Sequence, residues 1–208
     1  MDPPAPPGVA LRHGDRRIRL KWHMLRRRPP DPAHARANLR EGLARGAALE
    51  VDLQFSADGV GVCLHDETLD AETTGRGPVA ARTAREIAAL RQRGEDGVVG
   101  DEPPLRLDEV VEEAARRPPA HRGAIQLDLK ALALDDRSVA GFAGLVGPSA
   151  GRFTVAGEDW PLVERLVAAA PGVRPGFEPL RLFRHRPPRE PAGFRELAAR
   201  MLAAAPGA

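Results

Sequence analysis

Acidic side chains occur in two short apolar runs of the sequence at a spacing that suits metal binding. Glu50 and Asp52 alternate with apolar residues in the run Leu-Glu-Val-Asp-Leu, and Asp128 lies in a similar run, Gln-Leu-Asp-Leu-Lys. Residues two apart on a strand share a face, so Glu50 and Asp52 would hold two carboxylates close together. Such carboxylates repel each other unless a proton or a cation lies between them, and three hard oxygen ligands suit magnesium or calcium. Asp128 is the candidate third ligand, whereas a single cysteine and scattered histidines lack the spacing of a zinc site.

Two histidines, His23 and His65, also fall at the ends of predicted strands. Imidazole is the side chain best suited to proton transfer near neutral pH. A cation on a phosphate oxygen, with one imidazole that accepts a proton and another that donates one, is equipment for cleaving a phosphodiester. The residues therefore indicate metal-assisted phosphodiester cleavage as the candidate chemistry.

Each of these groups also has a purely structural interpretation. Glu50 and Asp52 could form the solvated face of a half-exposed strand, and Asp128 with Lys130 could form a simple ion pair at a strand end. Lysine is scarce, however, because only Lys21 and Lys130 are lysines among 31 basic residues. A compact ammonium differs physically from a planar guanidinium, which favours a specific role for Lys130.

Alternating apolar and polar residues predict the strands that position these groups. The predicted strands cover 17–25, 48–55, 60–66, 124–130 and 152–157, followed by a short sixth strand at 172–179. Spacing and capping residues predict helices at 31–46, 83–93, 105–117, 161–169 and 194–205. This alternation implies a parallel α/β sheet with right-handed crossovers, either doubly wound or closed into a barrel. The carboxyl ends of parallel strands lie on one side, so the acids, histidines and lysine should converge there.

Composition sets broad limits on the protein. The 208 residues are 42% hydrophobic with a formal net charge of +2, which predicts a single domain over 17–208 after a flexible, proline-rich arm at 1–16. The arginine clusters at 26–28 and 181–189 have little aromatic interleaving, which argues against a nucleic-acid partner. No run approaches the ~20 apolar residues of a membrane span or the pattern of a secretory signal. With a single cysteine, Cys63, an intramolecular disulfide is excluded, and the cytoplasm is the expected location.

Residues 49–90 carry an ordered set of motifs. They read LEVDLQFSADGVGVCLHDETLDAETTGRGPVAARTAREIAAL, with an acid-x-acid strand, an Asp-Gly turn, a His-Asp strand end and a Thr-x-x-Glu helix start. With PPLRLDEVVEEA and IQLDLK further along the chain, this run resembles the glycerophosphodiester phosphodiesterase family of the phospholipase-C-like phosphodiesterase superfamily. The resemblance covers roughly residues 18–180. It implies a TIM-type (β/α)8 barrel hydrolase that cleaves small glycerophosphodiesters to an alcohol and glycerol phosphate.

The resemblance also implies roles for individual residues. The implied ligands of one divalent cation, Mg or Ca, are Glu50, Asp52 and Asp128, the last with Asp where the family usually has Glu. His23 and His65 match the catalytic histidines, and Lys130 matches a lysine that contacts the substrate phosphate.

One departure from the family concerns the first histidine motif. The family has His-Arg-Gly, whereas this chain reads His23-Met24-Leu25, so the arginine expected to hold the phosphate is missing. An arginine at 26–28 is the candidate replacement, because these residues follow directly in the same loop.

Two further departures concern the Glu-Asn-Thr signature and the length of the chain. Ala-His-Ala stands at 33–35 in place of the signature, and His34, His121 and His185 have no recognisable partner and are expected to be solvated. The sequence offers about six of the eight β/α units, which predicts an open barrel edge that a homo-oligomer would cover. The alternative to an enzyme is a degenerate family member that binds a phosphate ligand or a protein without turnover.

Overall fold

The computed structural model describes residues 9–14, 16–28, 31–116 and 124–177. The strands are β1 (Ala10–His13), β2 (Arg16–Arg19), β3 (Lys21–Trp22), β4 (Ala48–Phe55), β5 (Gly61–Val62), β6 (Ile125–Leu129), β7 (Phe153–Gly157) and β8 (Arg174–Phe177). The α-helices are α1 (Arg36–Arg45), α2 (Ala84–Ala88), α3 (Leu107–Ala115), α4 (Asp136–Val146) and α5 (Trp160–Ala169). Three 3-10 helices are η1 (His23–Leu25), η2 (Val79–Ala81) and η3 (Gly147–Arg152).

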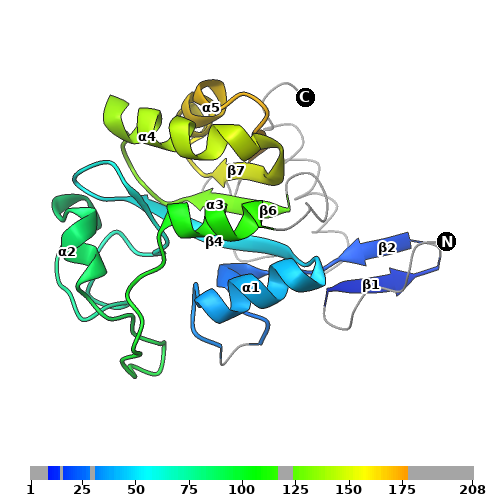
Figure 1. Ribbon diagram of the computed structural model, residues 1–208, viewed down its shortest axis with the longest axis horizontal. Helices are drawn as coiled ribbons and strands as arrows, with labels where there is room; N and C mark the ends of the chain where they lie inside the picture. The colour runs from blue at the N-terminus through cyan, green and yellow to red at the C-terminus, as the bar shows by residue number, and fades with distance from the viewer. Residues whose placement is uncertain (1–8, 15, 29–30, 117–123, 178–208) are drawn as a thin grey trace, which may run out of the picture.

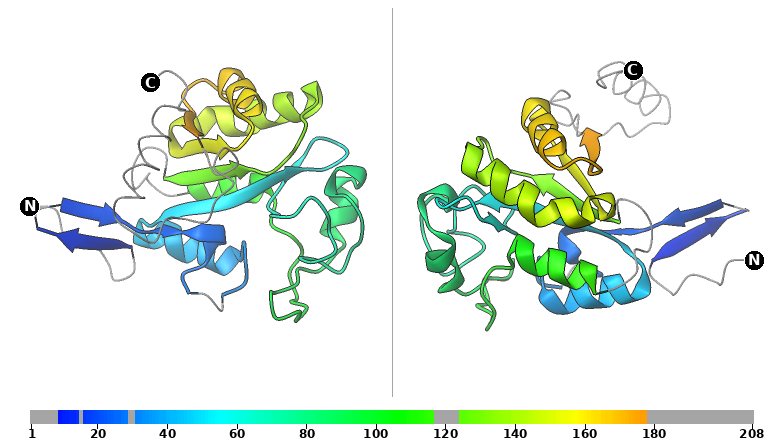
Figure 2. Two further views of the ribbon diagram at one scale, coloured as in Figure 1. Left: turned by 180° about the vertical axis from the view of Figure 1, so that it is seen from behind. Right: turned by 45° about the horizontal axis from the view of Figure 1, so that its top comes forward.

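A parallel sheet in the order β3-β4-β6-β7-β8 forms the centre of the described structure. Each parallel pair needs a crossover, and the crossovers carry α1, α2 with α3, α4, and α5 in turn. Helices α1, α3 and α4 lie over one face of the sheet (Figure 1). The left view of Figure 2 shows the opposite face. The predicted parallel α/β architecture is therefore confirmed. No helix in the described ranges is long and apolar enough to cross a membrane.

Side chains of the central strand divide between the two faces of the sheet. Leu49, Val51 and Leu53 are at most 1% exposed and form one core with Leu39 of α1 and Val110 of α3. Burying each such side chain stabilises the fold by about 1.5–3 kcal/mol. The intervening residues of β4 are polar and point to the opposite face, away from this core. The two-residue period of the strand thus packs apolar side chains against the helices on one face and gathers buried polar side chains on the other.

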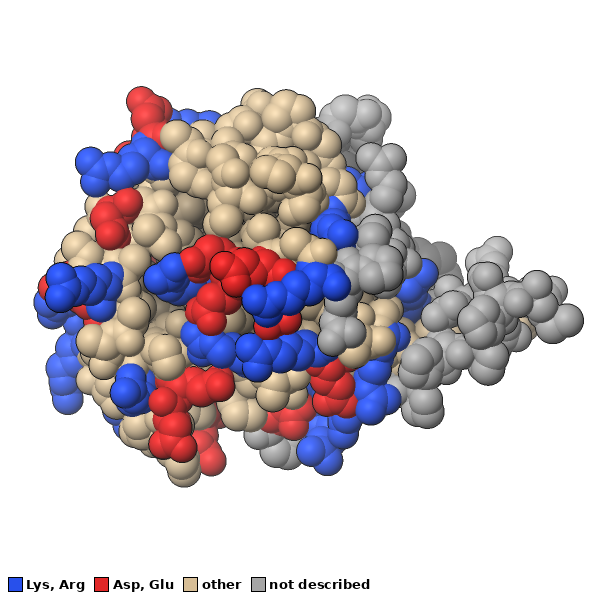
Figure 3. Space-filling view, in the orientation of Figure 1, with Lys and Arg blue, Asp and Glu red and all other residues tan. Residues whose placement is uncertain are grey.

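Ion pairs join the outer surfaces of α1 and α3. Arg36 donates two hydrogen bonds of 2.7 Å to the carboxylate of Glu109, and Arg40 donates one of 2.8 Å to Glu113. Acidic and basic side chains accordingly alternate over this face of the molecule (Figure 3). The bidentate pair between Arg36 and Glu109 fixes α1 relative to α3, because the two parallel bonds form only when the guanidinium and the carboxylate lie in one particular orientation.

Capping residues set the starts of three helices. Thr83 and Glu86 form the predicted capping box of α2, in which each side chain accepts from the other residue's backbone N–H. Asp135 and Asp159 accept backbone hydrogen bonds at the starts of α4 and α5. At the other end of α1, Gly46 adopts a left-handed conformation with φ of 69°, as predicted for its stop.

The segment 60–66 differs from the prediction of a further parallel strand. The turn at 56–59 reverses the chain, with Ser56 N–H bonded to Val60 O at 3.0 Å and Gly59 at φ of 78°. Only Gly61 and Val62 then pair, and they pair antiparallel with the end of β4. The described sheet therefore has five parallel strands where six were predicted.

Other boundaries also differ from the sequence prediction. Strand β1 lies within the predicted loose arm, where it pairs antiparallel with β2. Helix α2 ends at Ala88 because residues 91–93 make bridges and backbone bonds to residues 72–74. Helix α4 was not predicted, although Phe142 and Val146 give it a buried side. The helix predicted at 194–205 lies outside the described residues.

Candidate active site

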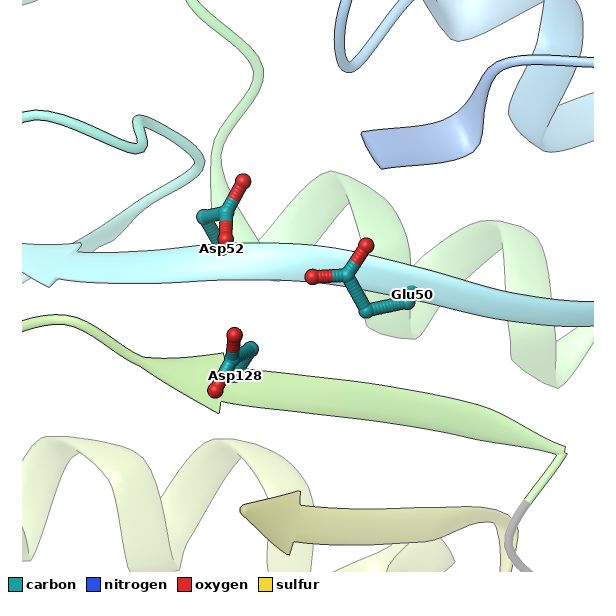
Figure 4. A group of neighbouring side chains, drawn as sticks. All are labelled: Glu50, Asp52 and Asp128. Atoms are coloured by element: carbon teal, nitrogen blue, oxygen red, sulfur yellow. The ribbon is translucent and has the colours of Figure 1, made fainter. Parts of the chain in front are cut away.

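Three carboxylates meet on the polar face of the sheet near the carboxyl ends of β4 and β6. Asp52 and Asp128 are directly paired in the parallel register, and Glu50 precedes Asp52 by two residues on the same face. Figure 4 shows the three side chains gathered between the two strands. One oxygen of each lies within 4.8 Å of the others, and the residues are 2%, 0% and 5% exposed, respectively, for Glu50, Asp52 and Asp128. The structure thus brings together the three acids that the sequence singled out.

Glu50 is held in an environment that disfavours its charge. Burial and the neighbouring charge of Asp52 raise the pKa of Glu50 to about 7, although the backbone N–H of Met24 donates a 2.5 Å hydrogen bond to its Oε2. The pKa of Asp52 is shifted in the opposite direction. Burial alone would raise its pKa, but the hydrogen bond and charge of His34 and the charge of Lys130 together lower it. Of the two carboxylates on β4, Asp52 is therefore the one whose charge the surroundings favour more strongly.

Lys130 provides the positive charge nearest to the carboxylates. Its Nζ lies 2.5 Å from Asp128 Oδ2 and 3.4 Å from Asp52 Oδ1. Burial alone would lower the pKa of Lys130, but the two carboxylates outweigh burial and raise it. The ammonium is thus permanently charged at the edge of the acidic cluster. The other lysine, Lys21, lies nearer the start of the sheet and donates to Gln126 Oε1 at 2.5 Å.

The cluster has unsatisfied oxygens that suit a hard divalent cation. Glu50 Oε1 and Asp52 Oδ1 are buried and accept no hydrogen bond from the described part of the chain. A buried polar atom without a hydrogen bond costs free energy, and two in one cluster are rare in folded proteins. Carboxylate oxygens at this spacing match the ligand preference of Mg²⁺ and Ca²⁺, so the residues present fit a single such ion.

The two predicted catalytic histidines, His23 and His65, lie on different segments beside this cluster. His23 begins η1 at the end of β3, is 72% exposed, and has Nε2 3.9 Å from Glu50 Oε2. His65 follows β5 and lines a cavity of about 270 Å³ together with Asp128 and Lys130. Its Nδ1 lies 2.9 Å from Asp66 Oδ1, and this contact raises the pKa of His65.

Glu72, which the sequence did not single out, supports the loop that carries His65. Its Oε2 accepts hydrogen bonds of 2.8 Å from the backbone N–H groups of both His65 and Asp66. Burial raises the pKa of Glu72. The residue lies in the loop between two motifs, so only the folded chain could indicate its contact with His65.

His34 is the clearest error of the sequence prediction. It was expected to be solvated, but the residue is 0% exposed and its Nε2 lies 3.1 Å from Asp52 Oδ2. No spacing signal links the two, because His34 lies in the irregular segment before α1 and 18 residues from Asp52. The other two histidines, His121 and His185, lie outside the described residues.

Of the three arginines at 26–28, one lines a cavity beside His65. Arg26 lines a cavity of about 360 Å³ with Met24 and His65, and its Nη1 donates to Glu95 at 2.5 Å. Arg27 and Arg28 do not line this cavity and instead pair with other carboxylates. Arg26 is therefore the one of the three arginines that borders the cavity beside His65.

A larger cavity adjoins this one. It has a volume of about 700 Å³ and shares Arg26, Arg93, Gly94 and Glu95 with the wall of the cavity beside His65. None of the acidic cluster lines it, so size alone does not make it the reaction site.

The fold and the polar cluster together define a class of protein. A parallel α/β sheet that presents carboxylates, a lysine and histidines at the carboxyl ends of its strands has the arrangement of a (β/α)8 barrel enzyme site. Comparison with known proteins narrows this class. A sequence profile described as the glycerophosphoryl diester phosphodiesterase family matches residues 32–128, and over this range the chain is similar to that family.

Curated relatives show the same similarity over part of their length. Glycerophosphodiester phosphodiesterase 1 of Bos taurus is 33% identical over 85 residues, which cover 40% of this chain and 26% of that protein. The protein of the same name from Mus musculus is 31% identical over 103 residues, covering 48% of this chain and 30% of that protein. The similarity thus spans less than a third of either mammalian protein.

Solved structures show the same fold. A phosphodiesterase from Oleispira antarctica in complex with sn-glycerol-3-phosphate aligns with a TM-score of 0.61 at 19% identity, covering 87% of this chain and 70% of that one. A glycerophosphodiester phosphodiesterase from Agrobacterium tumefaciens aligns with a TM-score of 0.57 at 28% identity, covering 74% and 63%. A family structure from Parabacteroides distasonis gives a TM-score of 0.59 at 19% identity, with 76% and 53% covered. The described sheet therefore corresponds to part of a TIM-type barrel, which resolves the alternative of a doubly wound sheet.

Proposed function

We propose that this protein hydrolyses glycerophosphodiesters to an alcohol and glycerol phosphate in a reaction that depends on one divalent cation, Mg²⁺ or Ca²⁺. The observation that carries the proposal is the meeting of three buried carboxylates with Lys130 and His65 at one edge of the sheet. The similarity of residues 32–128 to the family profile and the fold shared with a phosphodiesterase bound to sn-glycerol-3-phosphate support this choice of substrate.

The acidic residues and the lysine would bind and orient the phosphate. Glu50, Asp52 and Asp128 would hold the cation, which when bound supplies positive charge to a phosphate oxygen. Lys130 would then exchange part of its contact with Asp128 for a second phosphate oxygen, because its ammonium borders the cavity that His65 lines. A fixed positive charge there stabilises the negative charge that develops on the phosphate.

The histidines would transfer the protons. In the proposed sequence a free hydroxyl of the glycerol attacks the phosphorus and gives its proton to one imidazole. The other imidazole donates a proton to the oxygen of the departing alcohol, and water then opens the cyclic phosphate. Asp66 keeps the pKa of His65 raised, so His65 is suited to the protonated role, and His23 to the role of base.

Hydrolysis assays test the proposal. Wild-type protein with Mg²⁺ or Ca²⁺ should release choline from glycerophosphocholine, and His65→Ala and Asp52→Ala should each lose most of this activity. Bis(p-nitrophenyl) phosphate has no neighbouring hydroxyl, so it should be a far poorer substrate. Activity that survives both substitutions, or that needs no divalent cation, would reject the proposed mechanism.

A non-catalytic function is the second candidate. Met24 occupies the place of the family's phosphate-binding arginine, and the nearest candidate cation, Arg26, is paired with Glu95. Such a protein would bind glycerol phosphate without turnover. Binding of glycerol phosphate by calorimetry together with no hydrolysis of glycerophosphocholine would favour this candidate, and the Arg26→Ala variant tests whether Arg26 contributes to either.

The proposed substrate is a small molecule, and we propose no nucleic-acid partner. We propose the cytoplasm as the location of the protein. We also propose that a second copy of the chain packs against the open edge of the sheet. Sedimentation velocity tests the second copy: a concentration-independent monomer would exclude it.

A further inference from the structure

Among the described residues, one edge of β4 has no strand partner beside the acidic cluster. Strand β3 pairs only with Ala48 and Leu49, after which the chain turns into η1. Leu49 N–H points to β6, where it donates to Ala124 O at 2.9 Å. Backbone groups alternate in direction along a strand, so the N–H of Asp52 points to the β3 side and needs a partner from outside the sheet.

The His34 ring fills this position. Its Nε2 lies 3.2 Å from the backbone N of Asp52 and 3.1 Å from Oδ2 of the same residue. Its Nδ1 is buried and has no hydrogen-bond partner among the described residues. If Nδ1 carried the ring proton, a buried N–H would be unpaired and the Nε2 lone pair would face a carboxylate. Nε2 cannot accept from the Asp52 N–H and donate to Asp52 Oδ2 at the same time. A proton on Nε2 leaves that backbone N–H without this acceptor, but it makes a charge-assisted bond to Oδ2, which is stronger than the neutral bond it replaces.

Met24 connects His34 to the second carboxylate of β4. The backbone N–H of His34 donates to Met24 O at 2.8 Å, and the backbone N–H of Met24 donates to Glu50 Oε2 at 2.5 Å. Both residues have left-handed φ angles, 52° for Met24 and 50° for His34, which non-glycine residues rarely adopt. Such strain is kept only where the surrounding contacts require it. Gln92 supplies one of these contacts by donating to Ala33 O at 2.6 Å.

We propose that His34 and the Met24 peptide form a hydrogen-bonded tie that fixes the carboxylates of Asp52 and Glu50 at metal-ligand spacing, with His34 as a positioning residue. Each end of the tie binds a different carboxylate, and the two residues contact each other between them. The tie occupies the two places where the chain departs from its family's motifs, so the two changes act together. This inference rests on the proposed metal site.

Metal titrations of three proteins test the role of His34. His34→Gln keeps a side-chain N–H that can reach Asp52, whereas His34→Leu fills the space without a donor. Titration of the metal-free proteins with MgCl₂ or MnCl₂ by calorimetry should show about 10- to 100-fold weaker binding by His34→Leu and substantial recovery in His34→Gln. Equal affinity of wild type and His34→Leu would overturn the tie while the metal site stands. Absence of binding to the wild type would overturn both.

The wild-type protein gives a second test that does not depend on a variant that folds. Long-range ¹H–¹⁵N spectra of histidine-labelled, metal-free protein report which ring nitrogen of His34 carries the proton. The tie requires protonated Nε2 and unprotonated Nδ1. The opposite tautomer would overturn the inference, because His34 would then present no donor to Asp52.

Discussion

Replacing Glu50 by glutamine should stabilise the metal-free protein at alkaline pH. The residue is 2% exposed, and both burial and the charge of Asp52 oppose its ionisation. Glutamine keeps the shape and the oxygen that accepts from Met24 N–H, but it carries no charge to bury. The substitution thus removes the unfavourable free energy of burying a charged carboxylate, which in the wild type is retained at the proposed metal site.

The pKa of Glu50 sets the size of the effect. It rises from 4.5 to about 7 in the folded protein, and each pH unit of difference corresponds to about 1.4 kcal/mol. A carboxyl whose pKa is raised on folding binds its proton more tightly when folded, so stability falls as the pH rises from about 4.5 to 7. Glu50→Gln should therefore raise the free energy of unfolding by about 3 kcal/mol at pH 8 and by about 1 kcal/mol at pH 5. For a chain of this length, the former equals roughly 6–12 °C in melting temperature.

Thermal and urea unfolding in the presence of EDTA measure this difference, and Asp52→Asn is the matched control. Asp52 has a lowered pKa and contacts His34 and Lys130, so its neutral replacement should lower stability at pH 8 by about 1–3 kcal/mol. With Mg²⁺ or Ca²⁺ the order reverses, because the wild type gains stability from metal binding and Glu50→Gln gains little. A Glu50→Gln protein that is no more stable than wild type at pH 8 without metal would refute the reasoning.

Three further changes have defined outcomes. Asp66→Asn replaces the charged acceptor that raises the pKa of His65 with a neutral amide, so the imidazole should titrate at lower pH in an NMR titration; an unchanged titration would mean that the charge of Asp66 does not control it. Thr83→Ala breaks the capping box of α2 and should lower the free energy of unfolding by about 1 kcal/mol, which a loss near zero in urea denaturation would contradict. Phe142→Ala should cost about 3–5 kcal/mol, because this 1% exposed ring anchors α4 to the core, and a cost below 1 kcal/mol would show that the helix is not packed there.

Sequence reasoning located the acidic cluster because strand geometry is local. Glu50 and Asp52 share a face through the two-residue period, and the parallel register then places Asp128 opposite Asp52. The same reasoning failed for 60–66, whose composition is that of a strand. A tight turn at 56–59 sent that segment back along β4, and apolar content does not distinguish a short antiparallel partner from a central parallel strand.

The contacts of residues outside helices and strands could not be predicted from the sequence pattern. His34 looked like a loop histidine with no partner, and Glu72 lay between two motifs without a spacing of its own. Both are defined by contacts across the fold, with Asp52 in one case and with the His65 loop in the other. Such contacts depend on how irregular segments cross the sheet, which no periodicity encodes.

The sequence by itself determined the parallel α/β class, the resemblance to the phosphodiesterase family and the three carboxylates, because period, order of motifs and strand spacing are properties of neighbouring residues. Only the tertiary structure decided the balance of charge within the site. Asp52 is stabilised as an anion by His34 and Lys130, whereas Glu50 two residues away is pushed toward its neutral form. Two carboxylates of one strand differ because burial and partners from distant segments, rather than their place in the sequence, set the free energy of each charge.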